Sequence, residues 1–369
     1  MNTALSPRMP GAMRPAAGLA TLALALLAAA TPAAAQSPPS ARGVAATPVA
    51  SPSATTPATT TPAPKTKPKA KAPKPKARKP QGGALRLRLA GALRTRSRAW
   101  ALTGQALRVG GVVSRYEPGQ RVALRIWRGR RLVRVITPRV FPSRSRRFGR
   151  FSVRFASHRA GRLTVSAIKP ATSRQIRMVA RPVAASVVTG GGDGASVAAL
   201  QAGLAKLGYW VPRSGRMDAG TGRALMAFRK VNGMARTYGS SRGIVSMVLR
   251  GRGGFRARYP GLGKHVEADL GRQVLVFLYG GRVHQIFGIS SGKPSTPTIL
   301  GKFRFYSREL GTNSHGMVDS SYFYGGYAVH GYADVPPYAA SHGCLRTWIP
   351  NARAIHDWIR VGDPIAVYP

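Results

Sequence analysis

The only cysteine of the chain, Cys344, lies in the stretch Ser-His-Gly-Cys-Leu-Arg at residues 341–346, and His330 lies upstream of it. A lone cysteine with histidines near it suggests a thiol nucleophile. A free thiol has a pKa of about 8.5, so a neighbouring imidazole must take its proton before it reacts at neutral pH. Gly343 lets the backbone approach a substrate carbonyl closely. Amide N–H groups around Cys344 would then face the developing oxyanion.

Two other interpretations of the same residues have to be weighed. A single cysteine is often a small buried hydrophobic residue. Two histidines and a cysteine also suggest a zinc site, but the spacing of His330, His342 and Cys344 differs from the paired short spacings of common zinc sites. The chain has no second cysteine, and no motif suggests a nucleotide. We therefore expect no metal and no other cofactor.

Three blocks of the C-terminal region resemble the signature of a known family. They are His330-Gly331, the run at 341–346, and an upstream block of Ser-Ser-Gly-Lys at 290–293, Thr-Pro at 296–297 and Gly-Lys-Phe at 301–303. Together they are similar to L,D-transpeptidase catalytic domains, the cysteine enzymes that crosslink bacterial peptidoglycan. The resemblance covers about residues 262–369 and favours the nucleophile over the other two interpretations.

The resemblance implies that Cys344 is the nucleophile and His330 the general base, with the second ring nitrogen oriented by the backbone carbonyl of Gly331. Asp334 is an alternative acceptor for that nitrogen. We expect His342 to shape and polarise the pocket, although a purely structural histidine is the competing interpretation. The remaining catalytic-loop and substrate-binding candidates are Gly343, Ser341, Arg346, Tyr322 and Tyr324.

These candidates have different expected roles. Arg346 lies two residues after Cys344, so its guanidinium can point to the same side and clamp a stem carboxylate bidentately. The alternative is an arginine that ties down the local loop. Ser341 is expected to fix the turn by hydrogen bonds and to border the substrate. Tyr322, Tyr324 and also Tyr338 are candidates for the donor groove, although core or surface positions suit tyrosines equally well.

The family's reaction implies peptidoglycan stem peptides and glycan as partners. Cys344 would attack the carbonyl of residue three of a tetrapeptide stem and expel the terminal D-Ala. The side-chain amine of residue three on a neighbouring stem would then resolve the thioester. Water as acceptor would give an L,D-carboxypeptidase, and a protein amine would give wall-to-protein linkage. The alternative of another class is a non-catalytic wall-binding scaffold.

The N-terminus has the pattern of an export signal over residues 1–35. Arg8 and Arg14 precede a short apolar run at 18–30, and Ala33-Ala34-Ala35 offers a small-residue cleavage site. We therefore expect an exported protein associated with the cell wall; an uncleaved membrane anchor is the alternative. Residues 36–82 are rich in Pro, Ala, Thr and Lys and predict a disordered linker.

Charge is distributed unevenly along the chain. It contains 58 Lys and Arg against 10 Asp and Glu, and Glu117 is the only acid before Asp193. Such basicity suggests nucleic acid first, but the predicted export argues against it. Anionic envelope polymers or lipid head groups supply the same attraction to the basic linker. The competing explanation is a codon bias toward arginine.

The rest of the chain predicts a multidomain, mainly β protein. Alternation at 121–127 and 148–155, with recurring turn signals, indicates an immunoglobulin-like β-sandwich over 83–189. Residues 190–250 carry helical periodicity and resemble a small three-helix peptidoglycan-binding domain. Residues 262–369 alternate with period two and predict a β-sandwich with one or two helices. The segment 307–326, rich in Gly, Ser, Asn and Tyr, is a candidate lid before the predicted base.

Overall fold

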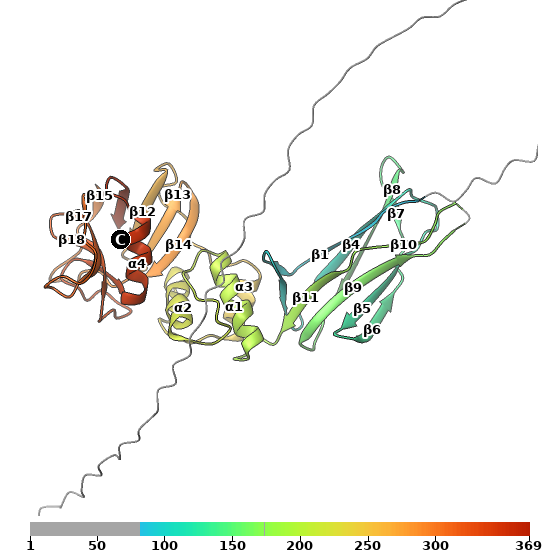
Figure 1. Cartoon of the computed structure of the whole chain (residues 1–369), viewed down its shortest axis with the longest axis horizontal. Helices are drawn as coiled ribbons and strands as arrows, with labels where there is room; N and C mark the ends of the chain where they lie inside the picture. The colour runs from blue at the N-terminus through green and yellow to red at the C-terminus, as the bar shows by residue number, and fades with distance from the viewer. Residues whose placement is uncertain (1–81, 173) are drawn as a thin grey trace, which may run out of the picture. The chain divides into compact units, whose positions relative to one another are not determined.

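The computed structural model describes residues 82–172 and 174–369 (Figure 1). The predicted export signal at 1–35 and all but the last residue of the predicted linker at 36–82 lie outside the described residues. No helix in the described ranges is long and apolar enough to cross a membrane.

The first described part, residues 82–189, forms two β-sheets around one core. One sheet has the order β1 (Leu85–Ala90), β4 (Leu107–Ser114), β8 (Phe148–Phe155), β7 (Phe141–Pro142). The other has the order β2 (Leu93–Arg94), β3 (Ala99–Leu102), β11 (Val183–Val188), β9 (Gly161–Lys169), β5 (Ala123–Arg128), β6 (Arg131–Ile136), and β10 (Met178–Val179) pairs with β9. Buried side chains such as Val109, Leu124 and Val165 fill the space between the sheets. The immunoglobulin type of this sandwich stays a prediction.

Three helices follow: α1 (Gly194–Lys206), α2 (Ala219–Val231) and α3 (Arg242–Leu249). Each begins after a residue whose side chain accepts a hydrogen bond from the backbone N–H three residues on; these capping residues are Asp193, Asp218 and Ser241. Such caps satisfy one of the free N–H groups of the first turn. Three helices were expected over 190–250, and the peptidoglycan-binding assignment remains a prediction.

The C-terminal part contains two further sheets and one helix. The first sheet has the order β14 (Arg282–Gly288), β13 (Val274–Tyr279), β12 (Lys264–Asp269), β20 (Pro364–Tyr368), β15 (Gly301–Arg304). The second has the order β16 (Ser307–Arg308), β17 (Val318–Tyr324), β18 (Tyr327–Tyr332), β19 (Leu345–Trp348). The helix α4 (Ile349–Trp358) begins with Pro350 in its first turn, where proline is well tolerated. A mainly β domain with a helix was predicted here.

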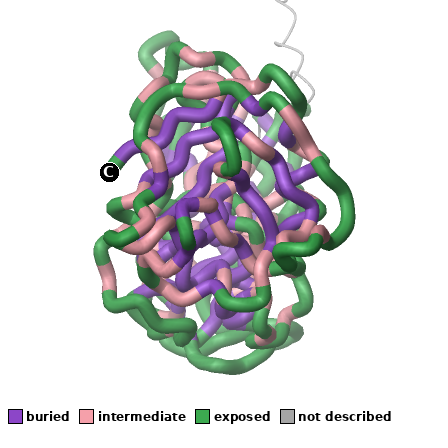
Figure 2. Tube along the Cα trace, turned by 90° about the vertical axis from the view of Figure 1, so that its left-hand side faces the viewer, coloured by how far each residue is buried: buried purple, intermediate pink, exposed green. Residues whose placement is uncertain are grey.

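Strand β13 is apolar on both faces, and the structure explains why. Leu275 and Phe277 point into the core of the C-terminal part, together with Phe287 and Val329. The alternate residues Val274, Val276 and Leu278 belong to a second core that they share with the helices. Successive side chains of a strand point to opposite faces, so a strand covered on both sides is continuously apolar. In Figure 2 the buried segments, in purple, run beneath exposed loops, in green.

The predicted lid at 307–326 is only partly a loop. Its second half forms β17, an inner strand of the second sheet, and its first two residues form β16. The high content of Gly, Ser and Tyr hid the strand, because Ser320, Ser321 and Phe323 are buried in place of a regular apolar alternation. A lid can therefore consist of residues 309–317 only.

Candidate active site

Two adjacent parallel strands carry the predicted nucleophile and base. β18 pairs with β19 in the register Val329↔Leu345 and His330↔Arg346. Cys344 directly precedes β19 and therefore comes beside the part of β18 that leads to His330. Since residues two apart on a strand share a face, Cys344 and Arg346 lie on the side of the sheet to which His330 points.

His330 is buried and held in one orientation. Its Nδ1 lies 2.9 Å from the carbonyl oxygen of Gly331, the partner that the resemblance implied. A carbonyl oxygen only accepts, so Nδ1 carries the proton and Nε2 of the neutral ring can accept one. Burial lowers the pKa of His330; the hydrogen bond to Gly331 opposes this and the charge of Arg346 adds to it. The imidazole is therefore neutral, as a general base requires, at neutral pH.

The thiol of Cys344 is partly buried. Its Sγ lies 3.4 Å from the carbonyl oxygen of Gly326. Burial raises the pKa of the Cys344 thiol, while the backbone N–H of Ala328 and the charge of Arg346 act to lower it. The resting state is thus a neutral thiol beside a neutral imidazole, and the thiolate forms only when a base removes the proton.

The side chain of Arg346 is largely buried and has an acidic neighbour. Its guanidinium stacks 4.1 Å above the ring of Tyr332, and Nη1 lies 3.9 Å from a carboxylate oxygen of Asp334. The side chain of Asp334 is 75% exposed, so this ion pair is weak and can give way to another carboxylate. Asp334 therefore pairs with Arg346, and the carbonyl of Gly331 is the acceptor for His330.

The turn before Cys344 is shaped by Ser341 and Gly343. The Ser341 hydroxyl donates to the carbonyl of Cys344 at 2.6 Å and accepts from the N–H of Gly343 at 3.1 Å. Ser341 is fully buried and fixes the turn, and its contact with substrate stays a prediction. Gly343 has a φ of +125°, and a Cβ there would come within 2.8 Å of the Tyr327 ring. Only glycine fits this position without strain.

The upstream block, residues 290–298, supports the same turn from behind. Ser290 exchanges two backbone hydrogen bonds of 2.9 Å with Arg346. The Thr298 hydroxyl donates to the carbonyl of Gly343 at 2.7 Å and accepts from the N–H of Gly292 at 2.9 Å. The Thr296 hydroxyl donates to the carbonyl of Ser341 at 3.1 Å. These contacts give the block a structural role that its sequence alone does not reveal.

The other predicted residues lie around the rim. His342 is exposed, and its Nε2 lies 3.5 Å from Nζ of Lys293, so the side chain is open to solvent and to substrate. The Tyr322 hydroxyl donates to Glu309 at 2.8 Å, which ties this tyrosine to the loop at 309–317. Tyr324 is half exposed and packs against the rings of Phe303 and Tyr327. Tyr338 is exposed as well, and all three tyrosines remain candidates for a groove.

Sequence reasoning missed Tyr327, Tyr332 and Thr298. Tyr327 packs against Gly343, Tyr332 lies under Arg346, and Thr298 holds the turn. Two of the three lie next to a quoted motif, because Thr298 directly follows Thr296-Pro297 and Tyr332 directly follows His330-Gly331. The two tyrosines offer no signal of their own without the pairing of β18 with β19. Among the described residues, no group of three or more His, Cys, Asp or Glu side chains is arranged to hold a metal.

A family model and several solved structures are described as L,D-transpeptidases. Residues 263–367 match the family model YkuD, described as the L,D-transpeptidase catalytic domain. A solved L,D-transpeptidase from Xylanimonas cellulosilytica is 32% identical over 48% of this chain and 95% of that chain, with a TM-score of 0.44. An L,D-transpeptidase from Stackebrandtia nassauensis is 19% identical over 48% and 93%, with a TM-score of 0.32.

A third solved structure, an L,D-transpeptidase from Mycobacterium smegmatis, is 15% identical over 77% of this chain and 99% of that chain, with a TM-score of 0.26. No curated protein matches the chain.

Proposed function

Because the chain belongs, through residues 263–367, to the L,D-transpeptidase family of peptidoglycan-crosslinking enzymes, we propose that it joins stem peptides by acyl transfer through Cys344. The donor is a tetrapeptide stem that loses its terminal D-Ala. The acceptor is the side-chain amine of residue three of a neighbouring stem. The arrangement of a buried, oriented His330 beside the only cysteine is the observation that carries this proposal.

The first half-reaction breaks one amide bond and forms a thioester. His330 takes the thiol proton on Nε2 while sulfur attacks the carbonyl of stem residue three. Collapse of the tetrahedral intermediate breaks the bond to D-Ala, and His330 returns the proton to the departing amine. The N–H of Gly343 already binds Ser341, so we assign the oxyanion to other donors of this loop.

The second half-reaction transfers the acyl group to an amine. The neutral acceptor amine attacks the thioester carbonyl, gives a proton to His330, and releases the thiolate, which takes that proton back. The amide bond that is broken supplies the free energy for the amide bond that is made, so no nucleotide is needed. Arg346 suits a stem carboxylate, because the acid that it pairs with, Asp334, is exposed and displaceable.

The segments outside the catalytic domain determine where the enzyme acts in this proposal. We propose that the protein is exported through the signal at 1–35 and stays associated with the envelope. The three-helix segment at 190–250 binds peptidoglycan in this proposal, supported by its predicted resemblance and its three capped helices. Retention of the full-length chain on purified sacculi tests this point, and a chain that washes through contradicts it.

The test of the reaction uses the full-length chain with a disaccharide-tetrapeptide, followed by mass spectrometry of protein and products. We expect an acyl adduct on the wild-type chain, D-Ala release and a crosslinked dimer, and none of these with Cys344→Ala. An adduct that resolves only to tripeptide would establish the L,D-carboxypeptidase instead. Attachment of the stem tripeptide to an added protein amine would favour wall-to-protein linkage. If Cys344 reacts neither with the tetrapeptide nor with a carbapenem, the non-catalytic wall-binding scaffold remains as the interpretation.

A further inference from the structure

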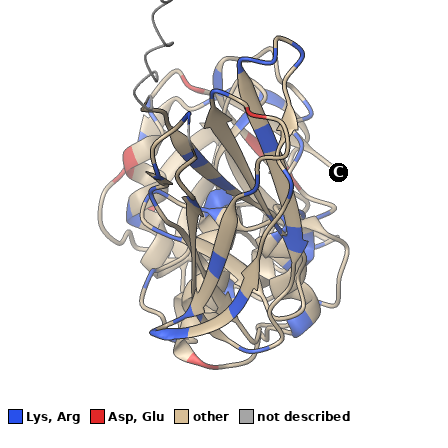
Figure 3. Cartoon of the chain, turned by 90° about the vertical axis from the view of Figure 1, so that its right-hand side faces the viewer, with Lys and Arg blue, Asp and Glu red and all other residues tan. Residues whose placement is uncertain are grey.

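The N-terminal β domain carries positive charge that its own acids do not balance. Residues 84–188 contain 25 Lys and Arg but a single acid, Glu117. That carboxylate accepts a hydrogen bond of 3.0 Å from Thr172 and lies 3.9 Å from Lys169, which is buried. No ion pair joins any arginine of the described part of this domain to a carboxylate. Figure 3 shows the basic residues spread over its strands and turns, with little red among them.

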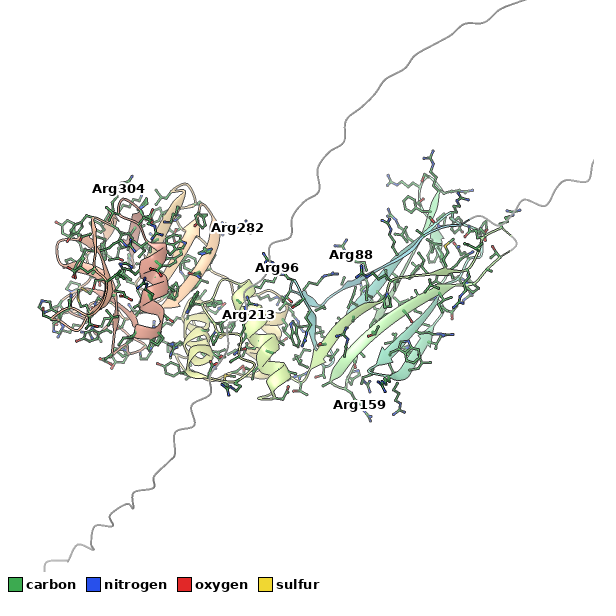
Figure 4. The ribbon with its side chains drawn as sticks, viewed as in Figure 1. Arg88, Arg96, Arg159, Arg213, Arg282 and Arg304 are labelled. Carbon is green, nitrogen blue, oxygen red and sulfur yellow. The ribbon has the colours of Figure 1, made fainter. Side chains whose placement is uncertain are left out.

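Five of these arginines surround one cleft of about 380 Å³. All five are exposed, and they come from three separate segments of the second sheet: Arg94, Arg96, Arg98, Arg162 and Arg181. Arg96, labelled in Figure 4, projects from the turn between β2 and β3. No Asp or Glu lines the cleft. Like charges gathered in this way repel one another, so an anion that enters the cleft relieves the repulsion.

The turn that presents three of the arginines is held firmly. The Thr95 hydroxyl donates to the carbonyl of Arg98 at 2.8 Å, and the N–H of Arg98 donates back to that hydroxyl at 3.1 Å. The backbone N–H of Thr95 also reaches the carbonyl of Arg98 at 2.8 Å. The guanidinium of Arg98 lies 5.2 Å from the centre of the Trp100 ring. A turn ordered before binding lowers the entropy that a ligand must overcome.

The floor of the cleft is an open strand edge. β11 pairs with β9 from Val183 to Val187, but on its other side it pairs with β3 only from Ser186 onward. Residues 183–185 therefore have no strand partner on the side that faces the turn. An unpaired edge presents backbone N–H and C=O groups, and its N–H groups are donors for an anion. The cleft thus combines guanidinium groups around its sides with peptide donors along its floor.

We propose that this cleft binds a repeat unit of a phosphodiester polymer of the cell envelope. The guanidinium fork matches two phosphate oxygens and is weakly hydrated, which favours phosphate over singly hydrogen-bonded anions. The volume suits a small unit of a polymer, and the excess charge of the domain attracts the flanking units. The envelope as the source rests on the proposed export, whereas the phosphate chemistry of the cleft does not.

The test measures binding of poly(glycerol phosphate) to the full-length chain, with a variant of the cleft and a matched control. Arg96→Gln, Arg162→Gln and Arg181→Gln together remove one charge from each segment around the cleft. Arg130→Gln, Arg144→Gln and Arg147→Gln remove the same charge from exposed turns outside it. We expect the cleft variant to raise Kd by about tenfold or more and to flatten its salt dependence, with a change below about threefold for the control.

Two polymers of other chemistry complete the test. Polygalacturonate, which carries carboxylates, should bind the wild-type chain more weakly than poly(glycerol phosphate) does. Its affinity for the cleft variant should be nearly the same as for the wild type. The proposal would be overturned if the cleft variant and the control lost the same affinity for poly(glycerol phosphate). It would also be overturned if polygalacturonate bound the wild-type chain as tightly as poly(glycerol phosphate). If single-stranded DNA bound more tightly than poly(glycerol phosphate) and lost affinity in the cleft variant, the ligand would be a nucleic acid and not an envelope polymer. Carbapenem acylation of Cys344 should be the same in all three proteins, so that failure of the proposed function is recorded separately from failure of the cleft.

Discussion

At the scale of single residues, Arg346 links the two reactive groups electrostatically. Its charge lowers the pKa of both Cys344 and His330. Removing that charge with Arg346→Gln should therefore raise both pKa values. The rate of Cys344 alkylation by iodoacetamide, which needs no stem carboxylate, should then rise at a higher pH than in the wild type. Arg346→Lys, which keeps the charge, should leave the profile nearly in place.

The same variant separates a substrate contact from an electrostatic role. If Arg346 binds a stem carboxylate, the kcat/KM for tetrapeptide falls by about tenfold to a hundredfold, the loss expected for a hydrogen bond to a charged group. Lysine restores this only partly, since it cannot bind bidentately. An unchanged kcat/KM together with a lower melting temperature would instead assign Arg346 to the local loop.

Gly343 is the second residue whose replacement is informative. Gly343→Ala places a Cβ at a φ of +125° and within 2.8 Å of Tyr327, so we expect a loss of about 1–3 kcal/mol in the free energy of unfolding. Acylation by a carbapenem should fall further than stability, because the turn that presents Cys344 must move. Gly261→Ala, where nothing lies within 4 Å, is the control. Equal acylation rates for both variants would contradict this.

At the scale of elements, the upstream block should control the nucleophile through Thr298. Thr298→Val keeps the shape of the side chain but removes its bonds to Gly343 and Gly292. We expect a loss of about 1–3 kcal/mol from the two unsatisfied backbone groups. The rate of Cys344 acylation should fall, measured on protein shown to be folded by circular dichroism. Thr237→Val, at an exposed position, should change neither quantity.

A buried lysine joins α2 to the residue that follows β14. Lys230 is 2% exposed, and its Nζ donates to the carbonyl of Ile289 at 2.7 Å. Burial, with a smaller effect of Arg236, lowers the pKa of Lys230 to about 7. Below that pH the lysine is protonated in both the folded and the unfolded chain, so folding carries the full free-energy cost of burying the charge. Above it the unfolded chain binds more protons, so stability rises with pH up to about 10.

Lys230→Gln tests this prediction, because glutamine keeps a donor for the carbonyl of Ile289 without a charge. Its melting temperature should exceed that of the wild type at pH 6.5, by about 2–4 °C for each kcal/mol that the loss of the buried charge adds to the free energy of unfolding. The gap should narrow as the pH approaches 9. Lys302→Gln, at an exposed position, serves as the control. Parallel curves for the Lys230 variant and the wild type from pH 6 to 9 would contradict the role of burial.

Prediction from sequence succeeded where the information is local. The residue types of Cys344 and His330 indicate thiol chemistry, and the alternation with period two over 262–369 predicted a mainly β domain. The structure adds the partners that lie far away along the chain, such as Thr298 for Gly343 or Tyr332 for Arg346. The lid was placed too broadly for a related reason. β17 is specified by its neighbours β16 and β18, and its own composition resembles that of a loop.

At the scale of the whole molecule, the cores do not follow the predicted domain boundaries. The prediction separated residues 190–250 from 262–369. One core nevertheless combines Leu200, Leu204 and Phe228 of the helices with Val274, Val276, Leu278 and Ile286 of the strands. The sequence could not show this. A strand that is apolar on both faces, such as β13, has the same residue pattern whether its second face packs against the same domain or against another. The helical segment is therefore also part of what stabilises the catalytic domain.

This shared core predicts that the catalytic domain is incomplete by itself. A fragment of residues 262–369 would expose the four strand residues of that core, Val274, Val276, Leu278 and Ile286, each worth about 1.5–3 kcal/mol when buried. We expect it to melt at lower temperature than residues 82–369, which keep the whole of that core, and to self-associate through the exposed face, as seen by size-exclusion chromatography. Val276→Thr should reduce the association of the short fragment while it destabilises the longer one. A monomeric short fragment with the melting temperature of the longer one would show that the helices are dispensable, and Cys344 acylation in both fragments would then be equal.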